Sequence, residues 1–550
     1  MSADADAALL AKLDAAELRI GLCEDANLAK LLDPALPNLL NFLTSTPPVR
    51  AKLMAILSHL NKRVKGNAEI ALPLRGLAEL YLRPAAAPVV ANFALVYLEM
   101  GFGRASADER RALLPRLLVG LAARPAAHQE QLLALLLGAL PTLPLPRAAK
   151  DITAEPPSAR LHPFLAAPAD RALVLGWLLD VLLYLPLRTA PPSPGGGATA
   201  ATPPGLSVAA AKRVCGKLAA DEVRGELLAA KKLAALRLLD ANADGERLFT
   251  PAEALPHALV ASCDSEGSVQ SRGDSILRSL TGARESSLEA LPLVKVLCTL
   301  VLGDGPAAAA AAGGGRSGDL AVAAADETRR SAASAAVRLK AVGLLCRSVA
   351  AASFFPGSLQ VVFGCAFGDG TTLKLQQAGC ELAHWMTTHA QLPLLAAVGA
   401  ALLSGLVKVV KGEPLAALAS PAHRGAPEAV AMRAFAYGAI TQLSKRVPAV
   451  VAADGSLPAL LFGSLGGEDA GARTSLQEAL AALADVHADG GALAASKGAA
   501  LRPLLLRAAG SASPHERLCA MVWAGRVFPS DDVPSRYACV LGAGDARPEV

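Results

Sequence analysis

The sequence is poor in aromatic residues and in charge. Only 4% of its 550 residues are Phe, Trp or Tyr and only 18% are charged, whereas 53% are hydrophobic. A core with so few rings must consist mostly of Leu, Ala and Val, and Leu and Ala favour helices over sheets. The composition therefore predicts packed helices, either as three or four domains or as one long repeat array.

A concentrated basic surface is also missing. The formal net charge is only +5, and Lys and Arg are scattered, the densest cluster lying at residues 62–65. Nucleic-acid-binding proteins usually carry a basic stripe, often with stacking aromatics between the charges. We therefore expect no nucleic-acid partner, and we interpret the basic residues as solvated helix ends.

The cysteines do not form a disulfide or metal framework. Their number, nine, is odd, and no CxxC pair occurs. Most lie in apolar helical stretches, which indicates a reducing compartment where a thiol behaves as a small hydrophobic group. Cys365 and Cys380 are conceivable as a redox pair, but without CxxC spacing or a nearby activating cation we predict that both are buried and inert.

No apolar stretch is long enough to cross a membrane, which takes about 20 residues. The stretch 132–145 carries two prolines, 392–407 ends at Lys408, and 172–187 contains Asp180. Residues 1–14 are acidic and polar, which does not fit a secretory signal. We interpret the three stretches as buried helices and expect no direct membrane insertion.

Motifs of enzymes are absent. The sequence contains no GxxxxGK[ST] phosphate loop, no dinucleotide fingerprint after a strand and no HExxH. His384 and His389 are five residues apart on an expected helix, so they do not share a face as a metal-binding pair would. We therefore predict a protein that is not an enzyme, with no catalytic, cofactor-binding or metal-binding residues and no cofactor.

Two stretches rich in Gly, Pro and Ala divide the chain into three helical blocks. Such runs cannot bury a face and are typical of flexible loops. We interpret them as insertions between helices of one array. The predicted organisation is N-terminal HEAT-like repeats at 1–188, a low-complexity loop at 189–205, middle repeats at 206–302, an Ala/Gly loop at 303–327, and C-terminal HEAT-like repeats at 328–550.

Helical periodicity recurs along the chain. In Val49 to Val64 the apolar residues fall three and four positions apart, which places them on one face of a helix. Similar segments recur at intervals, many near the ~40-residue period of HEAT and armadillo repeats. Each segment begins with a small or apolar residue followed by a basic one, and we place it near the start of the second helix of a pair. Besides Arg50, the basic residues are Arg338, Lys374, Arg433 and Arg473. Arg517 has the same position but follows Glu516.

One helix pair cannot bury its apolar face alone, so such pairs must stack on one another. The predicted fold is all-α, a HEAT/armadillo-like α-solenoid of stacked antiparallel helix pairs. Residues 545–550 resemble the opening of another second helix, and no polar capping repeat is visible. We therefore expect the chain to be part of a longer array.

The most distinctive segment is 528–537, between two expected helices. Ser530 or Asp531 is a candidate N-cap for the following helix, with Pro534 in its first turn. Two interpretations are open, turn chemistry between repeats, which we favour, and an exposed loop that contacts a partner. The candidate contact residues are Ser530, Asp531, Asp532, Ser535 and Arg536.

Several stretches resemble the HEAT-repeat proteasome adaptor and scaffold family, known in yeast as the ECM-twenty-nine type. They occur in the family's order from about residue 20 to the end, so that the resemblance is to the family's N-terminal portion. The Gly, Ala and Pro insertions are not part of the family's pattern. The resembling stretches are 49–65, 92–101, 212–216, 359–363, 439–448, 475–480 and, as the most specific, 527–537.

This resemblance implies a non-catalytic adaptor that binds the proteasome core and regulatory particles, tethers or stabilises them, and links them to other partners. It implies the cytoplasm and nucleus as the location, and contacts to membrane-trafficking proteins through other regions. The alternative is another HEAT or armadillo scaffold, such as a transport receptor or a vesicle-coat adaptor, because solenoids serve many functions. The slight positive charge speaks against a receptor for basic cargo.

Overall fold

The structure, a computed structural model, is described for the parts of the chain that follow. They are residues 3–84, 86–143, 163–184, 202–216, 226–243, 246–282, 288–304, 327–368, 370–416, 425–488 and 495–550. Most of the two low-complexity stretches, 189–201 and 305–326, lies outside these ranges, so the predicted loops and the three-block division stay predictions. The chain forms two compact units, and the boundary falls within α10 (Val208–Gly216) and α13 (Gly267–Gly282).

Unit 1 comprises residues 1–198, 211–250 and 264–272. Its described elements are α1 (Ala3–Leu22), α2 (Asp25–Asn41), η1 (Phe42–Thr44), α3 (Pro47–Gly66), α4 (Leu74–Leu82), α5 (Pro88–Phe102), α6 (Ala107–Leu117), η2 (Leu121–Ala123), α7 (Ala126–Ala139), η3 (Leu140–Thr142), η4 (Pro163–Leu165), α9 (Pro168–Leu183), α11 (Glu226–Leu239), β1 (Asn242–Ala243) and β2 (Glu246–Arg247). The two short strands pair antiparallel, with Asn242 opposite Arg247.

Unit 2 comprises residues 199–210, 251–263 and 273–550. Its described elements are α12 (Pro251–Ala261), α14 (Leu291–Leu302), α17 (Ala335–Leu345), α18 (Val349–Ala352), α19 (Gly357–Phe367), α20 (Leu373–His389), α21 (Leu392–Lys411), α22 (Glu413–Ala416), α23 (Pro427–Arg446), α24 (Pro448–Ala452), α25 (Leu457–Leu465), α26 (Ala470–Ala488), α27 (Ala495–Ala509), α28 (Pro514–Val527) and α29 (Val533–Ala543).

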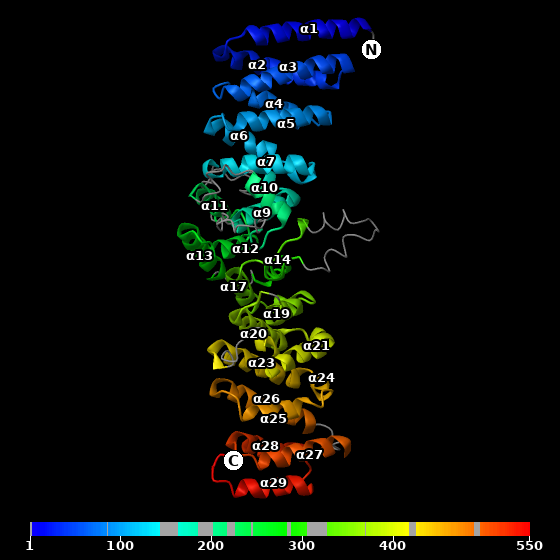
Figure 1. Cartoon of the computed structure of the whole chain (residues 1–550), viewed down its shortest axis with the longest axis vertical. Helices are drawn as coiled ribbons and strands as arrows, with labels where there is room; N and C mark the ends of the chain where they lie inside the picture. Colours follow the sequence, from blue (N-terminus) through cyan, green and yellow to red (C-terminus); the bar gives the residue numbers. More distant parts are fainter. Residues whose placement is uncertain are drawn as a thin grey trace, which may run out of the picture. The chain divides into compact units, whose positions relative to one another are not determined.

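Within each unit the helices stack in two layers (Figure 1). In unit 2, the second helices α17, α20, α23, α26 and α28 pack in succession, and each covers its first helix, as α19 packs on α20 and α21 on α23. In unit 1, α1 packs on α3 and α5 on α7, while α2, α4 and α6 form the other layer. This is the arrangement of an α-solenoid, and the predicted fold class is confirmed.

The amphipathic pattern of α3 appears in the structure as predicted. Its buried residues are the six apolar positions expected from the sequence: Val49, Leu53, Ile56, Leu57, Leu60 and Val64. Local sequence also sets several helix starts. Ser106 and Glu109 form a capping box at α6, and the Ser334 and Thr372 hydroxyls accept hydrogen bonds at the starts of α17 and α20.

The basic residues predicted to open second helices lie where expected. Arg338, Lys374, Arg433, Arg473 and Arg517 fall near the starts of α17, α20, α23, α26 and α28. The apolar stretches likewise become core helices, with 132–139 in α7 and 172–183 in α9, where Asp180 is buried. The expectation that no apolar stretch is long enough to cross a membrane was wrong for 392–407, because helix α21 continues to Lys411 and is long and apolar enough by length and composition. Half of this stretch is buried in the core, as in a core helix.

Candidate functional site

The loop that the sequence singles out joins α28 to α29 and is only partly exposed. Ser530 and Asp531 are exposed, whereas Asp532 and Ser535 are buried, with 8% and 3% of their surface accessible. Arg536 is exposed and donates from Nε to the Ser530 carbonyl oxygen at 2.5 Å. The loop therefore presents only part of the predicted set to a partner.

The cap of α29 is Asp532, so the expectation that Ser530 or Asp531 caps this helix was wrong. Asp532 Oδ2 accepts from the Ser535 backbone N–H at 3.1 Å, and Ser535 Oγ donates to the Asp532 carbonyl oxygen at 3.0 Å. Asp532 Oδ1 accepts from Arg502 Nε of α27 at 2.8 Å. Asp532 is the N-cap because it directly precedes Val533 and Pro534, the first two residues of the helix. Pro534 thus lies in the first turn, as predicted.

Asp532 and Ser535 thus hold the loop in place, and neither side chain is free for a partner. Ser530, Asp531 and Arg536 stay candidate contact residues. Sequence reasoning did not find the apolar face that follows them on α29, where Val533, Tyr537 and Val540 are 73%, 58% and 69% exposed. Their spacing of four and three residues was the signal that could have revealed it.

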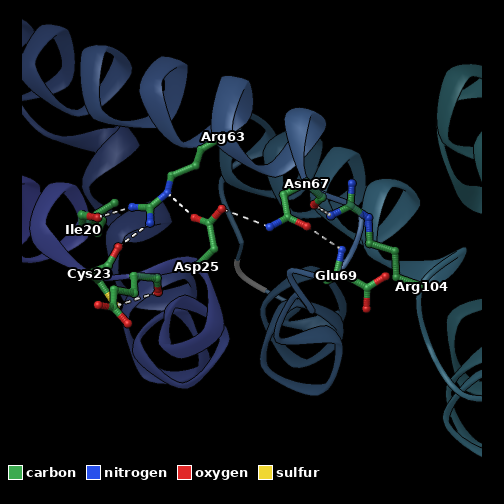
Figure 2. A network of polar contacts seen from close by, with 8 residues as sticks. Ile20, Cys23, Asp25, Arg63, Asn67, Glu69 and Arg104 are labelled. Carbon is green, nitrogen blue, oxygen red and sulfur yellow. Dashed lines mark hydrogen bonds and ion pairs between the residues drawn. The ribbon is translucent and has the colours of Figure 1, made fainter.

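A polar network connects successive helices at one end of unit 1 (Figure 2). Arg63, at the end of α3, donates to the carbonyl oxygen of Ile20 at 2.6 Å and to that of Cys23, at the end of α1. Its Nε also donates to Asp25 Oδ1 at 2.6 Å. The side chain therefore satisfies helix-end carbonyls that have no partner within their own helix.

The same device is repeated one helix pair further along. Arg104, just after α5, donates to the carbonyl oxygens of Val64, Asn67 and Ile70 at 2.8–3.0 Å. Asn67 Nδ2 donates to the second oxygen of Asp25 at 3.0 Å. Hydrogen bonds from Asn67 and then Arg63 lower the pKa of Asp25 from its ordinary value, so this carboxylate stays ionised as part of the network.

In unit 2 the corresponding contact is buried. Arg433 of α23 donates from Nη2 to Glu468 Oε1 at 2.8 Å and from Nε to both Glu468 oxygens at 3.0 and 3.1 Å. Tyr437 donates its hydroxyl to Glu468 Oε2 at 2.8 Å. Burial alone would raise the pKa of Glu468, but hydrogen bonds from Arg433 and Tyr437 outweigh it and lower that pKa.

Arg517, the basic residue predicted near the start of α28, makes an equivalent contact with a carboxylate. Arg517 donates from Nη2 to Asp545 Oδ1 at 2.9 Å and from Nη1 to the Ser511 carbonyl oxygen at 2.9 Å. The hydrogen bond from Arg517 lowers the pKa of Asp545. The arginines that the sequence placed at helix starts therefore connect their helix to neighbouring turns, which gives them a structural role.

The described residues offer little that resembles catalytic chemistry. Burial raises the pKa of Cys365 to about 11 and of Cys380 to about 12, so both thiols stay neutral, as predicted. The expectation that no cation lies nearby was wrong, because Arg338 contacts Cys365 and acts against this rise. Burial likewise lowers the pKa of His384. Across the described ranges, no group of three or more His, Cys, Asp or Glu side chains could hold a metal ion.

Two grooves lie between successive second helices. One, of about 330 Å³, lies between α1 and α3 and is lined by Ile20, Leu60 and the charged Glu17 and Arg63, among others. The other, of about 300 Å³, lies between α26 and α28. Both volumes lie at the lower end of the range of about 300–1,000 Å³ that ligand pockets span.

Comparison with known proteins identifies the family of this chain. The family described as "Proteasome component ECM29, N-terminal" matches residues 13–542. The chain belongs to this family. The resemblance seen in the sequence is thus confirmed, and the match covers both units.

Two curated relatives are similar over most of the chain. The human proteasome adapter and scaffold protein ECM29 is 30% identical over 98% of this chain, and the Drosophila melanogaster proteasome-associated protein ECM29 homolog is 24% identical over 80% of it. The chain spans 28% of the length of the human protein and 20% of the fly protein. Among solved structures, Kap121p is 13% identical and covers 90% of this chain and 49% of its own, with a TM-score of 0.28, too low to carry an argument.

Proposed function

We propose that this chain is a non-catalytic adaptor that binds proteasome core and regulatory particles and tethers or stabilises them. The observation that carries the proposal is the family match over residues 13–542, together with relatives whose names describe a proteasome adapter, scaffold or associated protein. Stacked helices support it physically, since a solenoid presents an extended surface suited to large protein partners.

The proposal includes location and partners. We place this adaptor in the cytoplasm and nucleus. Its other partners would be membrane-trafficking proteins contacted through other regions, and we expect no nucleic-acid binding. The transport-receptor and coat-adaptor alternative has no comparable support, because the matching family and both relatives carry proteasome names.

Affinity purification tests the adaptor proposal. The tagged chain is expressed in cells, purified at low ionic strength, and its co-purifying proteins are quantified by mass spectrometry. We expect subunits of the core and regulatory particles in near-constant ratios. Transport or coat components in their place, with no proteasome subunits, would contradict the proposal.

Charge reversal tests whether the α28–α29 loop contributes to this binding. In the variant Asp531→Arg/Arg536→Glu, both exposed charges of the loop change sign while the Asp532 cap is kept. The matched control is Arg75→Glu/Glu79→Arg, which reverses two exposed charges on α4 and likewise leaves the net charge unchanged. If the loop is a contact, the loop variant recovers several-fold less proteasome than the control; equal recovery would remove the loop from the contact surface.

A further inference from the structure

The groove between α26 and α28 has a rigid apolar floor. Trp523 of α28 is 2% exposed, donates its indole N–H to the Leu480 carbonyl oxygen of α26 at 3.0 Å, and meets Phe462 edge-on with ring centroids 5.3 Å apart. These contacts hold the indole ring in place. The floor is therefore formed before any partner arrives, which reduces the entropy that binding would cost.

The walls of this groove are apolar and only half-buried. Ala481 of α26 and Leu518 and Val522 of α28 line it, and each retains some exposure to solvent. The volume of about 300 Å³ is roughly twice that of the ~150 Å³ apolar cavity that takes up benzene. The groove has room for one branched aliphatic or aromatic side chain.

The rim supplies hydrogen-bonding groups and one charge. Thr474 and Gln477 stand on α26 beside Glu478, and Thr474 and Glu478 are exposed. Glu478 is the only ionised side chain of the lining. Among the residues that the structure describes, it has neither a hydrogen bond nor an ion pair, so its negative charge is open to a partner's cation.

The α1–α3 groove shows why this charge is distinctive. There Glu17 is bonded by Lys52 Nζ at 2.6 Å, and Arg63 is bonded to Asp25 at 2.6 Å. The charges of that lining are compensated within the molecule. Of these two grooves, only the one between α26 and α28 combines an apolar cavity with an uncompensated charge.

We propose that the α26–α28 groove binds a short segment of a partner protein in which a large aliphatic or aromatic residue is followed closely by Lys or Arg. The apolar side chain fills the cavity over Trp523, and the cation pairs with Glu478. Thr474 and Gln477 hydrogen-bond to the segment's backbone. The proposal rests on the proposed function only for the partner's identity, since the chemistry of the groove is independent of it.

A defined peptide tests the groove without any proteasome. The probe is dye-labelled acetyl-Ser-Gly-Leu-Phe-Lys-Lys-Gly-amide, and the comparison peptide has Glu in place of both Lys residues. Fluorescence anisotropy with the full chain measures both affinities. We expect the Lys peptide to bind at least about tenfold more tightly than the Glu peptide, because like charges placed side by side oppose binding. Equal affinities, or no binding of the Lys peptide, would overturn the proposal.

Three variants localise the binding. Glu478→Lys should weaken the Lys peptide about tenfold or more and improve the Glu peptide, a reversal that unfolding could not produce. Ala481→Phe should fill the cavity and abolish binding of both peptides. Glu79→Lys makes the same charge change on an exposed residue of α4, outside the groove, and should leave both affinities unchanged. If Glu478→Lys and Glu79→Lys act alike, the groove is not the site. If the peptide assay fails while proteasome subunits still co-purify with the chain, the groove proposal is wrong and the adaptor proposal is unaffected.

Discussion

The Arg63–Asp25 pair of unit 1 and the Arg433–Glu468 pair of unit 2 both connect neighbouring turns or helices, but they lie in different environments. In unit 1 the side chains of Arg63 and Asp25 are 27% and 42% exposed. In unit 2 those of Arg433 and Glu468 are 4% and 1% exposed. Water therefore competes for the hydrogen bonds of the first pair and is excluded from the second. Removing one partner should therefore lower the free energy of unfolding less for the exposed pair than for the buried pair.

Loss of the buried carboxylate has the largest expected effect. Glu468→Ala removes the carboxylate that compensates the charge of the buried Arg433 guanidinium, which should destabilise unit 2 by about 3–5 kcal/mol. The measurement is urea unfolding followed by tryptophan fluorescence in a Trp177→Phe background, in which both remaining tryptophans, Trp385 and Trp523, belong to unit 2.

The control for this prediction is an exposed pair in the same unit. Asp485→Ala removes the partner of Arg526, and the two side chains are 65% and 52% exposed. We expect a change of no more than about 0.5 kcal/mol. If both variants lose the same stability, burial does not distinguish the pairs and the comparison between the units fails.

Acid should weaken the buried pair in a defined direction. The pKa of Glu468 lies below its ordinary value of 4.5, so its ionised form contributes stability that is complete above that value and is lost as pH falls through the lowered pKa. The stability difference between the wild type and Glu468→Gln should be constant above about pH 5.5 and shrink below about pH 4. A stability difference that grows on acidification would show that the pKa of Glu468 is raised rather than lowered.

Arg63→Ala should cost less than the loss of Glu468. It removes hydrogen bonds to Ile20, Cys23 and Asp25, but water replaces them in part, so we expect about 1–2 kcal/mol. Hydrogen–deuterium exchange should rise at the end of α1, whose carbonyl groups lose their donor. Arg63→Lys keeps the charge but not the planar fork of donors, and should restore less than half of the loss; full restoration would mean that charge alone matters.

Apart from the exposed control, the smallest expected effect on stability concerns the cap of α29. Asp532→Ala removes the acceptor for the Ser535 N–H and the partner of Arg502, at a cost of about 1 kcal/mol. Amide exchange in the first turn of α29 should accelerate. Asp531→Ala, one residue away, should leave this exchange unchanged; if Asp531 mattered as much, the cap would be assigned to the wrong residue.

Much of the fold could be predicted because its signals are local. Spacings of three and four residues revealed the buried face of α3, and the opening arginines marked the second helices before their positions were known. The partners of those arginines could not be predicted. Glu468 lies 35 residues beyond Arg433, and Asp545 lies 28 residues beyond Arg517. Which residues meet over such distances depends on the path of the loops between helices, and helical periodicity does not predict that path.

The candidate site was predicted less well than the fold. The sequence located the α28–α29 loop, but the cap was predicted to be Ser530 or Asp531, because side-chain chemistry alone does not distinguish these residues from Asp532. The backbone direction at Val533 and Pro534 decides for Asp532, and the approach of Arg502 from α27 completes the site. The α26–α28 groove had no signal in the sequence, since its walls come from two helices about 40 residues apart.

By itself, the sequence determined that the fold belongs to the all-α class, which faces of several helices are buried, and to which family the chain is similar. These properties depend on residues within a few turns of one another or on blocks in a fixed order. Tertiary structure alone decided which charges are compensated and which stay open, as with Glu17 and Glu478. Whether a charge finds a partner depends on side chains that packing brings together from distant positions, and the free energy of that contact depends on how much water the packing excludes.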